Sequence, residues 1–541
     1  MSLKRIFIVG LMLSTKLCGQ TAFHFPLDGT PSLTGNYAEI RPNHFHAGLD
    51  FKTDPKKNLP VYAVADGYVS RIKVSTHGYG KALYITHGNG LISVYGHLNT
   101  YNYATKKYTD AAQTQQETFE IELFPKQGEL KVKQGDIIGY SGNTGDSEGP
   151  HLHFEFRDEK TEVPLNPLRF LKVEDIVAPV IEHVAFYEDD YTDPFYIKVK
   201  KKIDTISVGN KLGVGVDCYD TEHLKGSKNN IYKAELYLDD ILFYSHTLDS
   251  IPFDLARYVN TYCDYKAKKR DKVKIQKCFI GKNNDLPIYK TSANKGFFYL
   301  NDTLYHKLTV RVYDFYKQNT EVNVVIKRKA ATKLPPIVVP ATDCLKAYNG
   351  STLDYSMEMP EKSLYTDVTM RDSFANNKLF LSAGWYDVPL QKNCTLSMKV
   401  PTQLIKYESK LCLAEVSGKE QSFAGGNFEN GNVKAMVKNF GIYKISLDTI
   451  PPKIKIAVLP KKSPYKTGSI IAFKVSDDFS GIGKFKLTIN GIFQLAEYEH
   501  KTSTIFFVIK DDTPRGKVSV KLVIDDKKGN SAVMEKQLLI Q

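Results

Sequence analysis

The sequence feature that most limits the fold is the regularity with which glycine interrupts short runs of β-forming residues. In the N-terminal third, runs rich in β-branched and aromatic residues occur at 59–65, 68–74, 82–87, 91–98, 137–141 and 151–157. The turn sequences Asp66-Gly67, Gly78-Tyr79-Gly80 and Gly88-Asn89-Gly90 separate the first four. Because no amphipathic helical period is evident there, the pattern predicts an all-β domain of antiparallel hairpins.

The same rhythm continues to the C-terminus. With 541 residues, the chain is long enough for about three to five domains. Composition changes and proline-rich junctions near 173–179, 334–336 and 448–452 mark the boundaries. We predict an antiparallel β barrel-sandwich domain over 20–173, β-sandwich domains over 174–330 and 331–447, and an immunoglobulin-like domain over 448–541. The polar stretch 101–127 interrupts the first domain and is predicted to be an inserted hairpin or lid.

The N-terminus has the features of a secretory signal peptide. Lys4 and Arg5 precede an apolar run over 6–13, and small residues follow near Cys18-Gly19. This order predicts a signal peptide over 1–19 and export to the periplasm or the cell surface. The run is too short to span a bilayer, and we expect no transmembrane segment in the mature chain.

Charge and cysteine content narrow the class of protein further. The formal net charge is +13, and removal of 1–19 with its three basic residues lowers it to +10. Such a charge favours anionic surfaces, but the basic residues are dispersed and no nucleic-acid-binding motif is present, so nucleic acid is not expected as a partner. Six cysteines remain after residue 19, none in a Cys-x-x-Cys pair; three disulfides and free buried thiols both stay open.

Histidine is concentrated in the first predicted domain. Residues 20–172 hold eight of the 13 histidines, where an even distribution would place about four. Two short motifs carry several of them, His46-Ala47-Gly48-Leu49-Asp50 and Gly149-Pro150-His151-Leu152-His153-Phe154-Glu155. In a strand, residues i and i+2 share a face, so His151 and His153 direct their rings into one space.

These residue types suit a catalytic metal site. Two histidines and an aspartate can supply three ligands to Zn²⁺ and leave the fourth tetrahedral position open. The helix-borne His-Glu-x-x-His motif is absent, so histidine has to carry the protons. From the residues alone, either His151 or His153 could bind the metal while the other stays free, and His97 is a second free candidate.

Taken together, the segment resembles the lysostaphin/LytM-type zinc metallopeptidases. The resemblance covers about residues 35–170 and rests on His-x-x-x-Asp at 46–50, Tyr-Gly-His-Leu at 95–98 and His-Leu-His at 151–153. Supporting stretches are 60–67 and 132–145, the latter with Gly139-Tyr140-Ser141-Gly142-Asn143-Thr144-Gly145. The stretch between His97 and His151 is longer than in the compact family pattern because of 101–127.

The resemblance implies roles for five residues. His46, Asp50 and His153 would bind one zinc ion per chain, and His97 and His151 would be the catalytic histidines. The implied substrates are peptidoglycan cross-bridges or stem peptides, cleaved by an exported zinc metalloendopeptidase. A non-catalytic cell-wall-binding regulator and a peptidase acting on secreted proteins are the alternatives.

The remaining histidines of the domain have a simpler interpretation. We expect His24, His77 and His87 to be hydrogen-bonded core or surface residues. His44 could line the groove or lie outside it, and Glu155 could support His153 or have a purely structural role.

Overall fold

The protein is an all-β molecule built from successive packed sheets. The computed structural model describes residues 22–29, 32–54, 58–188, 193–199, 205–224, 226–329, 342–383, 388–459 and 464–541. The predicted signal peptide over 1–19 and the predicted junction at 334–336 therefore lie outside the described residues. No helix among those described is long and apolar enough to cross a membrane.

The first part of the chain contains two sheets. The larger has the strand order β1-β4-β13-β8-β7-β6-β10, with β11 beside β6 and β14 beside β13, and the smaller has the order β5-β12-β9. The elements are β1 (Leu33–Gly35), β2 (Ile40–Arg41), β3 (His44–Phe45), β4 (Leu49–Lys52), β5 (Pro60–Tyr62), β6 (Gly67–Val74), β7 (Lys81–His87), β8 (Leu91–Leu98), β9 (Thr100–Tyr101), α1 (Tyr103–Gln115), β10 (Ile121–Leu123), β11 (Lys131–Val132), β12 (Ile137–Tyr140), β13 (His151–Asp158), β14 (Pro164–Leu165) and the 3₁₀ helix η1 (Pro167–Arg169).

The second part packs a five-stranded sheet, β16-β15-β18-β21 with β23, beside a six-stranded sheet, β17-β25-β24-β19-β20-β22. Its elements are β15 (Val180–Tyr187), β16 (Phe195–Lys198), β17 (Ile206–Val208), β18 (Lys211–Tyr219), β19 (Lys233–Leu238), β20 (Ile241–Thr247), η2 (Phe253–Tyr258), α2 (Val259–Tyr262), α3 (Tyr265–Arg270), β21 (Ile275–Lys277), β22 (Tyr289–Ser292), η3 (Ala293–Gly296), β23 (Phe298–Tyr299), β24 (Tyr305–Tyr313) and β25 (Asn319–Arg328).

The third and fourth parts each consist of two sheets. The elements of the third are β26 (Tyr348–Ser351), β27 (Tyr355–Met359), β28 (Met370–Ala375), β29 (Lys378–Ala383), β30 (Pro389–Lys399), η4 (Thr402–Lys410), β31 (Leu411–Ser417), β32 (Glu420–Gly425), β33 (Asn427–Glu429), β34 (Asn432–Asn439) and β35 (Gly441–Leu447). Those of the fourth are β36 (Lys453–Val458), β37 (Ile470–Ser476), β38 (Ile482–Ile489), β39 (Ile492–Gln494), β40 (Glu497–Glu499), η5 (His500–Thr502), β41 (Thr504–Val508), β42 (Gly516–Asp526) and β43 (Ser531–Ile540).

Each of the four parts encloses its own hydrophobic core. We propose that they are domains with the boundaries predicted above, the last of them immunoglobulin-like. The strands expected in the first domain all form, and the run 91–98 coincides with β8. The six cysteines after residue 19 are buried free thiols, so the disulfide alternative was wrong.

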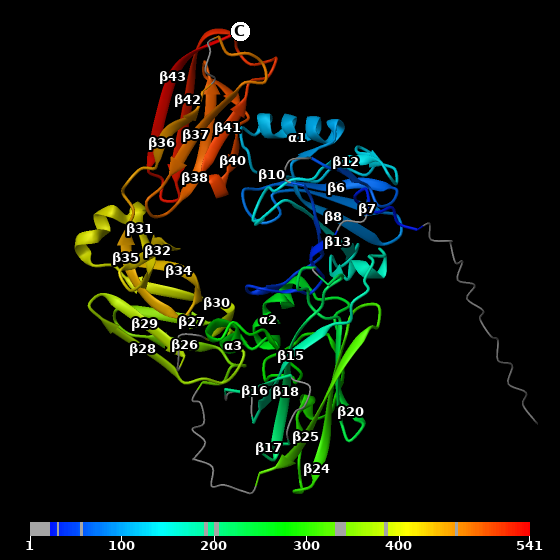
Figure 1. The fold of residues 1–541 in the computed structure, drawn as a ribbon. Helices are drawn as coiled ribbons and strands as arrows, with labels where there is room; N and C mark the ends of the chain where they lie inside the picture. The colour runs from blue at the N-terminus through cyan, green and yellow to red at the C-terminus, as the bar shows by residue number, and fades with distance from the viewer. Residues whose placement is uncertain are drawn as a thin grey trace, which may run out of the picture.

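The insert at 101–127 forms a helix where a hairpin was expected. The side chain of Asn102 caps α1 by accepting a hydrogen bond from the Thr105 amide. The helix buries only Thr105, Thr109 and Gln113. Because this buried face is polar, the sequence shows no apolar helical period. The helix lies against the C-terminal domain (Figure 1), where Lys510 Nζ is 3.3 Å from a carboxylate oxygen of Asp110.

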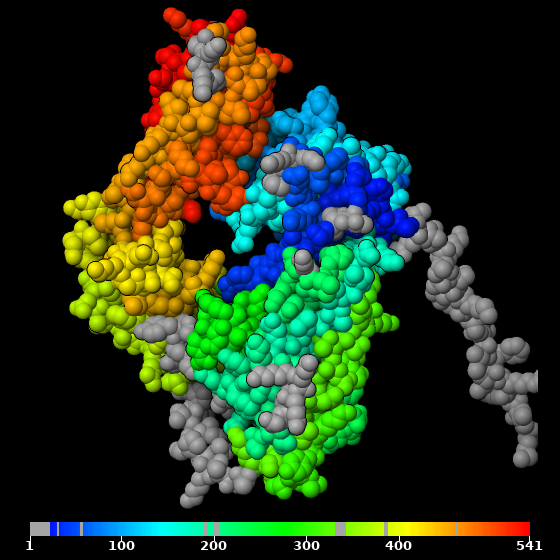
Figure 2. Space-filling model, viewed as in Figure 1, coloured from blue at the N-terminus to red at the C-terminus, as the bar shows by residue number. Residues whose placement is uncertain are grey.

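The four domains follow one another around a ring (Figure 1). The fourth returns to the first: Phe119 and Phe485 place their ring centroids 6.2 Å apart, and Lys81 Nζ lies 2.7 Å from Glu497 Oε2. Figure 2 shows an opening at the centre of the ring, bordered by the first, third and fourth domains. The first domain therefore contacts the fourth domain as well as the second, which follows it in the chain.

A separate apolar cluster joins the first domain to the second. The β2–β3 hairpin contributes Tyr37, Ile40 and Phe45, which are buried against α2 and against Leu248 of the second domain. The ring centroids of Phe45 and Tyr262 are 5.3 Å apart. The residue after Phe45 is His46, so this cluster fixes the chain at the start of the first histidine motif.

We expect a fragment over 20–330 to be more stable than a fragment over 20–173. Both contain the core of the first domain, but the shorter one exposes Tyr37, Ile40 and Phe45 to water. Exposure of a large apolar side chain costs about 1.5–3 kcal/mol. Thermal unfolding followed by circular dichroism should give the lower midpoint for the shorter fragment, with stronger binding of a hydrophobic dye. Equal midpoints would show that the cluster does not stabilise the first domain.

Candidate metal centre

Three adjacent strands bring together all five residues selected from the sequence. Strands β4, β13 and β8 are neighbours in the large sheet. Four of the five side chains are buried and that of His151 is nearly so. His46 lies in the connection between β3 and β4, Asp50 in β4, His97 in β8, and His151 and His153 in β13.

Strand register explains why they meet. His153 lies directly opposite Asp50 on one side and Gly96 on the other. Directly opposed residues of antiparallel strands share a face, so Asp50 projects beside His153. The glycine of the His46 motif is required by the same packing, because a Cβ at Gly48 would lie 2.1 Å from the carbonyl oxygen of Phe154.

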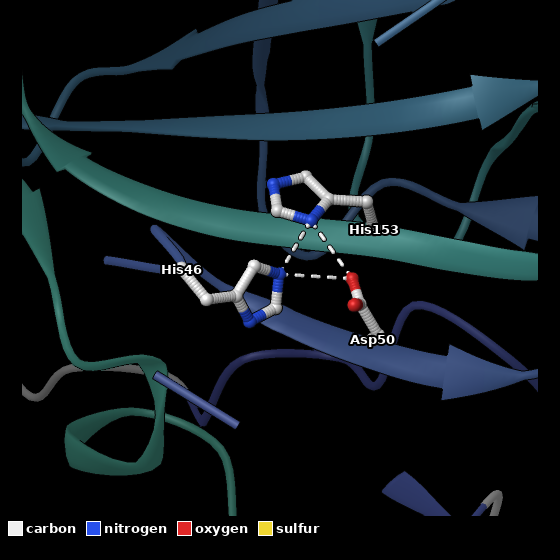
Figure 3. A group of neighbouring side chains, drawn as sticks. All are labelled: His46, Asp50 and His153. Carbon is white, nitrogen blue, oxygen red and sulfur yellow. Dashed lines mark hydrogen bonds and ion pairs between the residues drawn. The ribbon is translucent and has the colours of Figure 1, made fainter. Parts of the chain in front are cut away.

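His46, Asp50 and His153 converge on one point (Figure 3). His46 Nε2 is 3.0 Å from Asp50 Oδ1, His153 Nδ1 is 2.9 Å from the same oxygen, and the two nitrogens are 3.0 Å apart. Three electron-rich atoms thus face one another in a buried space. Two imidazole nitrogens and one carboxylate oxygen are a donor set that suits Zn²⁺ and leaves its fourth ligand position open.

Hydrogen bonds outside the cluster fix which ring nitrogen points inward. His46 Nδ1 donates to the carbonyl oxygen of Asn36 at 2.7 Å, which leaves Nε2 for the cluster. His153 Nε2 donates to Glu155 Oε1 at 2.7 Å, which leaves Nδ1. The Arg41 guanidinium binds Asp50 Oδ2 at 2.5 Å, so that Oδ1 faces the histidines. Such outer contacts orient metal ligands and set their basicity.

In the absence of a bound cation, a proton on His153 compensates the negative charge of the cluster. Burial lowers the pKa of His46. Burial also opposes ionisation of His153, but Asp50 and Glu155 outweigh it and raise the pKa of His153 to about 9. The carboxyl of Asp50 is desolvated, yet the adjacent histidines hold its pKa well below the usual range. A cation binding here would displace the proton on His153 Nδ1.

Glu155 is the most buried charge of the site and is fully paired. Arg157 Nε lies 2.6 Å from Glu155 Oε2, and the Tyr79 hydroxyl donates to Oε1. Burial opposes ionisation of Glu155, but the Arg157 charge and the His153 contact lower its pKa to about 2. Glu155 therefore stays ionised and accepts a hydrogen bond from His153 Nε2.

His97 and His151 lie beside the cluster, and each is hydrogen-bonded to a backbone carbonyl through the same ring nitrogen, Nδ1. His97 Nδ1 donates to the carbonyl oxygen of Thr144 at 2.7 Å, and His151 Nδ1 donates to that of Gly149 at 2.7 Å. In each neutral ring, Nε2 is then the free acceptor. His151 Nε2 is buried, lies 3.4 Å from Asp50 Oδ1 and has no hydrogen-bond partner among the described residues.

The backbone of His97 departs from the extended conformation of a strand. Its φ is +58°, a conformation that few non-glycine residues adopt. The two rings are 4.7 Å apart between centroids. Burial, reinforced by the charges of His151 and His153, lowers the pKa of His97 to about 3, so His97 is neutral over the physiological range.

The other histidines of the domain lie elsewhere. His87 is buried, bonded to the Asp66 carbonyl and to Ser93; His77 pairs with Asp146; His24 and His44 are exposed. The sequence reasoning missed Asn36, Arg41 and Tyr79. Arg41 could have been suspected because it lies in the stretch that leads to His46, but nothing local marks the other two.

Comparison with known families identifies two segments of the chain. Residues 44–116 and 122–167 match peptidase family M23, and residues 345–448 match the Zu5-like domain. The first match contains all five site residues, and its gap falls within the insert. The second match covers most of the third domain.

Curated relatives are similar to part of the chain. DD-carboxypeptidase/endopeptidase Mpg of Neisseria meningitidis serogroup B is 33% identical over 123 residues, which are 23% of this chain and 22% of that protein. Peptidoglycan DD-endopeptidase ShyA of Vibrio cholerae is 31% identical over 144 residues, 25% of this chain and 27% of that protein. The chain thus matches about a fifth to a quarter of the length of these relatives.

Two solved structures are similar to part of the chain. The catalytic domain of the prophage-encoded M23 protein EnpA from Enterococcus faecalis is 28% identical, with a TM-score of 0.20, over 27% of this chain and 94% of that one. The lysostaphin catalytic domain of Staphylococcus simulans is 24% identical, with a TM-score of 0.20, over 26% and 91%. The family match confirms the resemblance seen in the sequence: the chain contains a segment that matches peptidase family M23.

Proposed function

We propose that this protein is an exported zinc metalloendopeptidase that hydrolyses peptide bonds in peptidoglycan stem peptides or cross-links. The observation that carries the proposal is the convergence of two imidazole nitrogens and one carboxylate oxygen beside two further histidines with free Nε2 atoms. His46, Asp50 and His153 hold one zinc ion. When bound, zinc supplies Lewis-acid chemistry, polarising a carbonyl and lowering the pKa of water.

His97 and His151 move protons and stabilise charge. A carbonyl oxygen accepts a hydrogen bond from Nδ1 of each ring, and His151 Nε2 lies 3.4 Å from Asp50 Oδ1 in the cluster. A neutral imidazole accepts a proton at Nε2 and returns it to the leaving amine. Once protonated, the same Nε2–H donates a hydrogen bond to an oxygen on which negative charge develops.

The names of the relatives and the sequence support the proposed substrate class and location. Two of the relatives are named for peptidoglycan or for DD-carboxypeptidase and endopeptidase activity. A basic mature chain with a predicted signal peptide is suited to an anionic wall polymer outside the cytoplasm. Retention of all five residues argues against the alternative of a non-catalytic wall-binding regulator.

Digestion of three substrates tests the proposal. The purified full chain should release new muropeptides from intact sacculi and cleave soluble muropeptides, with denatured casein left uncut; mass spectrometry identifies the bonds. Asp50→Ala should lose both zinc, measured by elemental analysis, and cleavage, since a cluster without its carboxylate offers too few ligands. Cleavage of casein alone would favour a peptidase for secreted proteins, and normal zinc in Asp50→Ala would overturn the ligand assignment.

Ligands and catalytic residues should respond differently to substitution. His97→Ala and His151→Ala should each retain about one zinc per chain and lose about 10²–10⁴-fold in kcat, the usual contribution of general acid–base catalysis. His153→Ala should lose zinc. If His97→Ala or His151→Ala loses zinc as readily as His153→Ala does, the roles are reversed.

Glu155 should act through His153. Glu155→Gln removes the charge that accepts the His153 Nε2 proton, and we expect zinc affinity to fall about 10–100-fold. Competition with a chromogenic chelator measures the affinity, and the exposed residue Glu159 provides the matched control Glu159→Gln. An unchanged affinity in Glu155→Gln would assign the residue a structural role only.

A further inference from the structure

A second group of carboxylates lies away from the M23 site, where the first domain meets the second. Asp175 lies in the connection between these domains, Asp220 directly follows β18, and Asp314 directly follows β24. One carboxylate oxygen from each lies within 4.8 Å of the other two. Asp220 and Asp314 are buried, at 7% and 1% exposure, and Asp175 is half-buried.

No positive side chain among the described residues forms an ion pair with these three carboxylates. Asp314 accepts hydrogen bonds at 2.9 Å from the amide and from the side chain of Gln318. Asp175 accepts one from the Val177 amide at 3.2 Å and one from the Gln318 side chain at 3.5 Å. These neutral donors compensate little of the charge. Burial, together with mutual repulsion, raises the pKa of Asp220 to about 8 and that of Asp314 to about 6. Ionised acids in such a place destabilise the fold unless they take up protons or a cation joins them.

Unpartnered oxygens point into the same space. Asp220 Oδ1 and Asn229 Oδ1 are buried and have no hydrogen-bond partner among the described residues, and Asn229 is only 5% exposed. The two residues face each other across an antiparallel bridge, with N–O distances of 3.0 and 2.8 Å, so their side chains share a face. Both line the cavity that Asp175 also lines. The side-chain oxygen of Asn229 belongs to an amide and not to an acid, and none of the described residues donates a hydrogen bond to it.

We propose that Asp175, Asp220 and Asp314 bind one Ca²⁺ ion, with the side-chain oxygen of Asn229 beside it. Every donor offered is an oxygen, which favours a hard cation over zinc. Ca–O distances of about 2.3–2.6 Å allow ligand oxygens to be up to about 5 Å apart, as these are. Ca²⁺ accepts many protein ligands in irregular geometry, whereas Mg²⁺ keeps several waters and needs a near-octahedral shell, so a buried cage favours Ca²⁺.

The proposed ion would stabilise a junction that leads to the M23 site. Glu222 Oε2, in the loop after Asp220, accepts a hydrogen bond from the Leu33 amide at 3.1 Å. Asn230 and Asn36 exchange two further bonds, at 2.7 and 3.0 Å. The carbonyl of Asn36 is the one that orients His46. Calcium would hold the loop over 220–230 in place without touching the zinc ligands.

Calcium binding to the full chain tests this. After passage over a chelating resin and readdition of one equivalent of ZnCl₂, CaCl₂ should bind at one ion per chain by elemental analysis and by ⁴⁵Ca equilibrium dialysis. Saturating CaCl₂ should raise the unfolding midpoint by about 4 °C or more, because an ion that binds only the folded state stabilises it. Asp220→Asn and Asp314→Asn should each abolish binding and the shift, while Asp254→Asn, an exposed site in the same domain, should keep both.

The outcomes separate this proposal from the proposed function. Asp50→Ala should lose zinc and still bind calcium, and Asp220→Asn should do the reverse. Absence of calcium binding by the wild-type chain, together with a higher midpoint for Asp220→Asn in the absence of any cation, would show a cluster of protonated acids and overturn the site. An equal shift with MgCl₂ at the same concentration would overturn the assignment to calcium.

Discussion

Strand β13 has one face in the apolar core and the other in the M23 site, and the geometry of the site depends on the register of this strand. Its alternate residues Leu152, Phe154 and Phe156 are fully buried in the core of the first domain. The residues between them are the proposed ligand His153, its carboxylate partner Glu155 and Arg157, which neutralises that partner. Because the side-chain period of a strand is two, a register slip by one residue would exchange these faces and bury the charges in the apolar core. Burial of Leu152, Phe154 and Phe156 therefore fixes the register of β13 and, with it, the position of His153.

The polar face of β13 is stable only as a connected set. Arg157 pairs with Glu155, Glu155 accepts from His153, and His153 meets Asp50, whose other oxygen binds Arg41. Removing one member would leave a buried charge unpaired, which typically costs about 3–5 kcal/mol. The same network fixes the orientation of the His153 ring. Stability of the fold and readiness for a metal ion therefore rest on the same hydrogen bonds.

Local sequence pattern was sufficient for the strands, and it selected five residues that the structure brings close together. The runs that became β6, β7, β8 and β13 alternate or cluster β-branched and aromatic residues between glycine turns, so their state is encoded within about ten residues. The predicted hairpin at 101–127 was wrong because α1 packs a polar face and its cap, Asn102, looks like a turn residue. Asn36 and the Ile40–Phe45 hairpin could not be assigned, since their partners lie some 200 residues away in the second domain. Contacts of that kind have no periodicity to detect.

The loop over 143–147 shows how far such long-range contacts reach into the site. Its Thr144 carbonyl orients His97, and its Ser147 hydroxyl is 3.1 Å from His151 Nδ1. The turn needs glycine at Gly145, where φ is +72° and a Cβ would lie 2.3 Å from the Gly78 carbonyl oxygen. From the fourth domain, Lys501 Nζ approaches the Ser147 carbonyl oxygen at 3.3 Å and also contacts that of Asn143. The two histidines proposed to carry protons are thus oriented by a loop that the last domain of the ring supports, so the closure of the ring bears on the geometry of the site as well as on the stability of the chain.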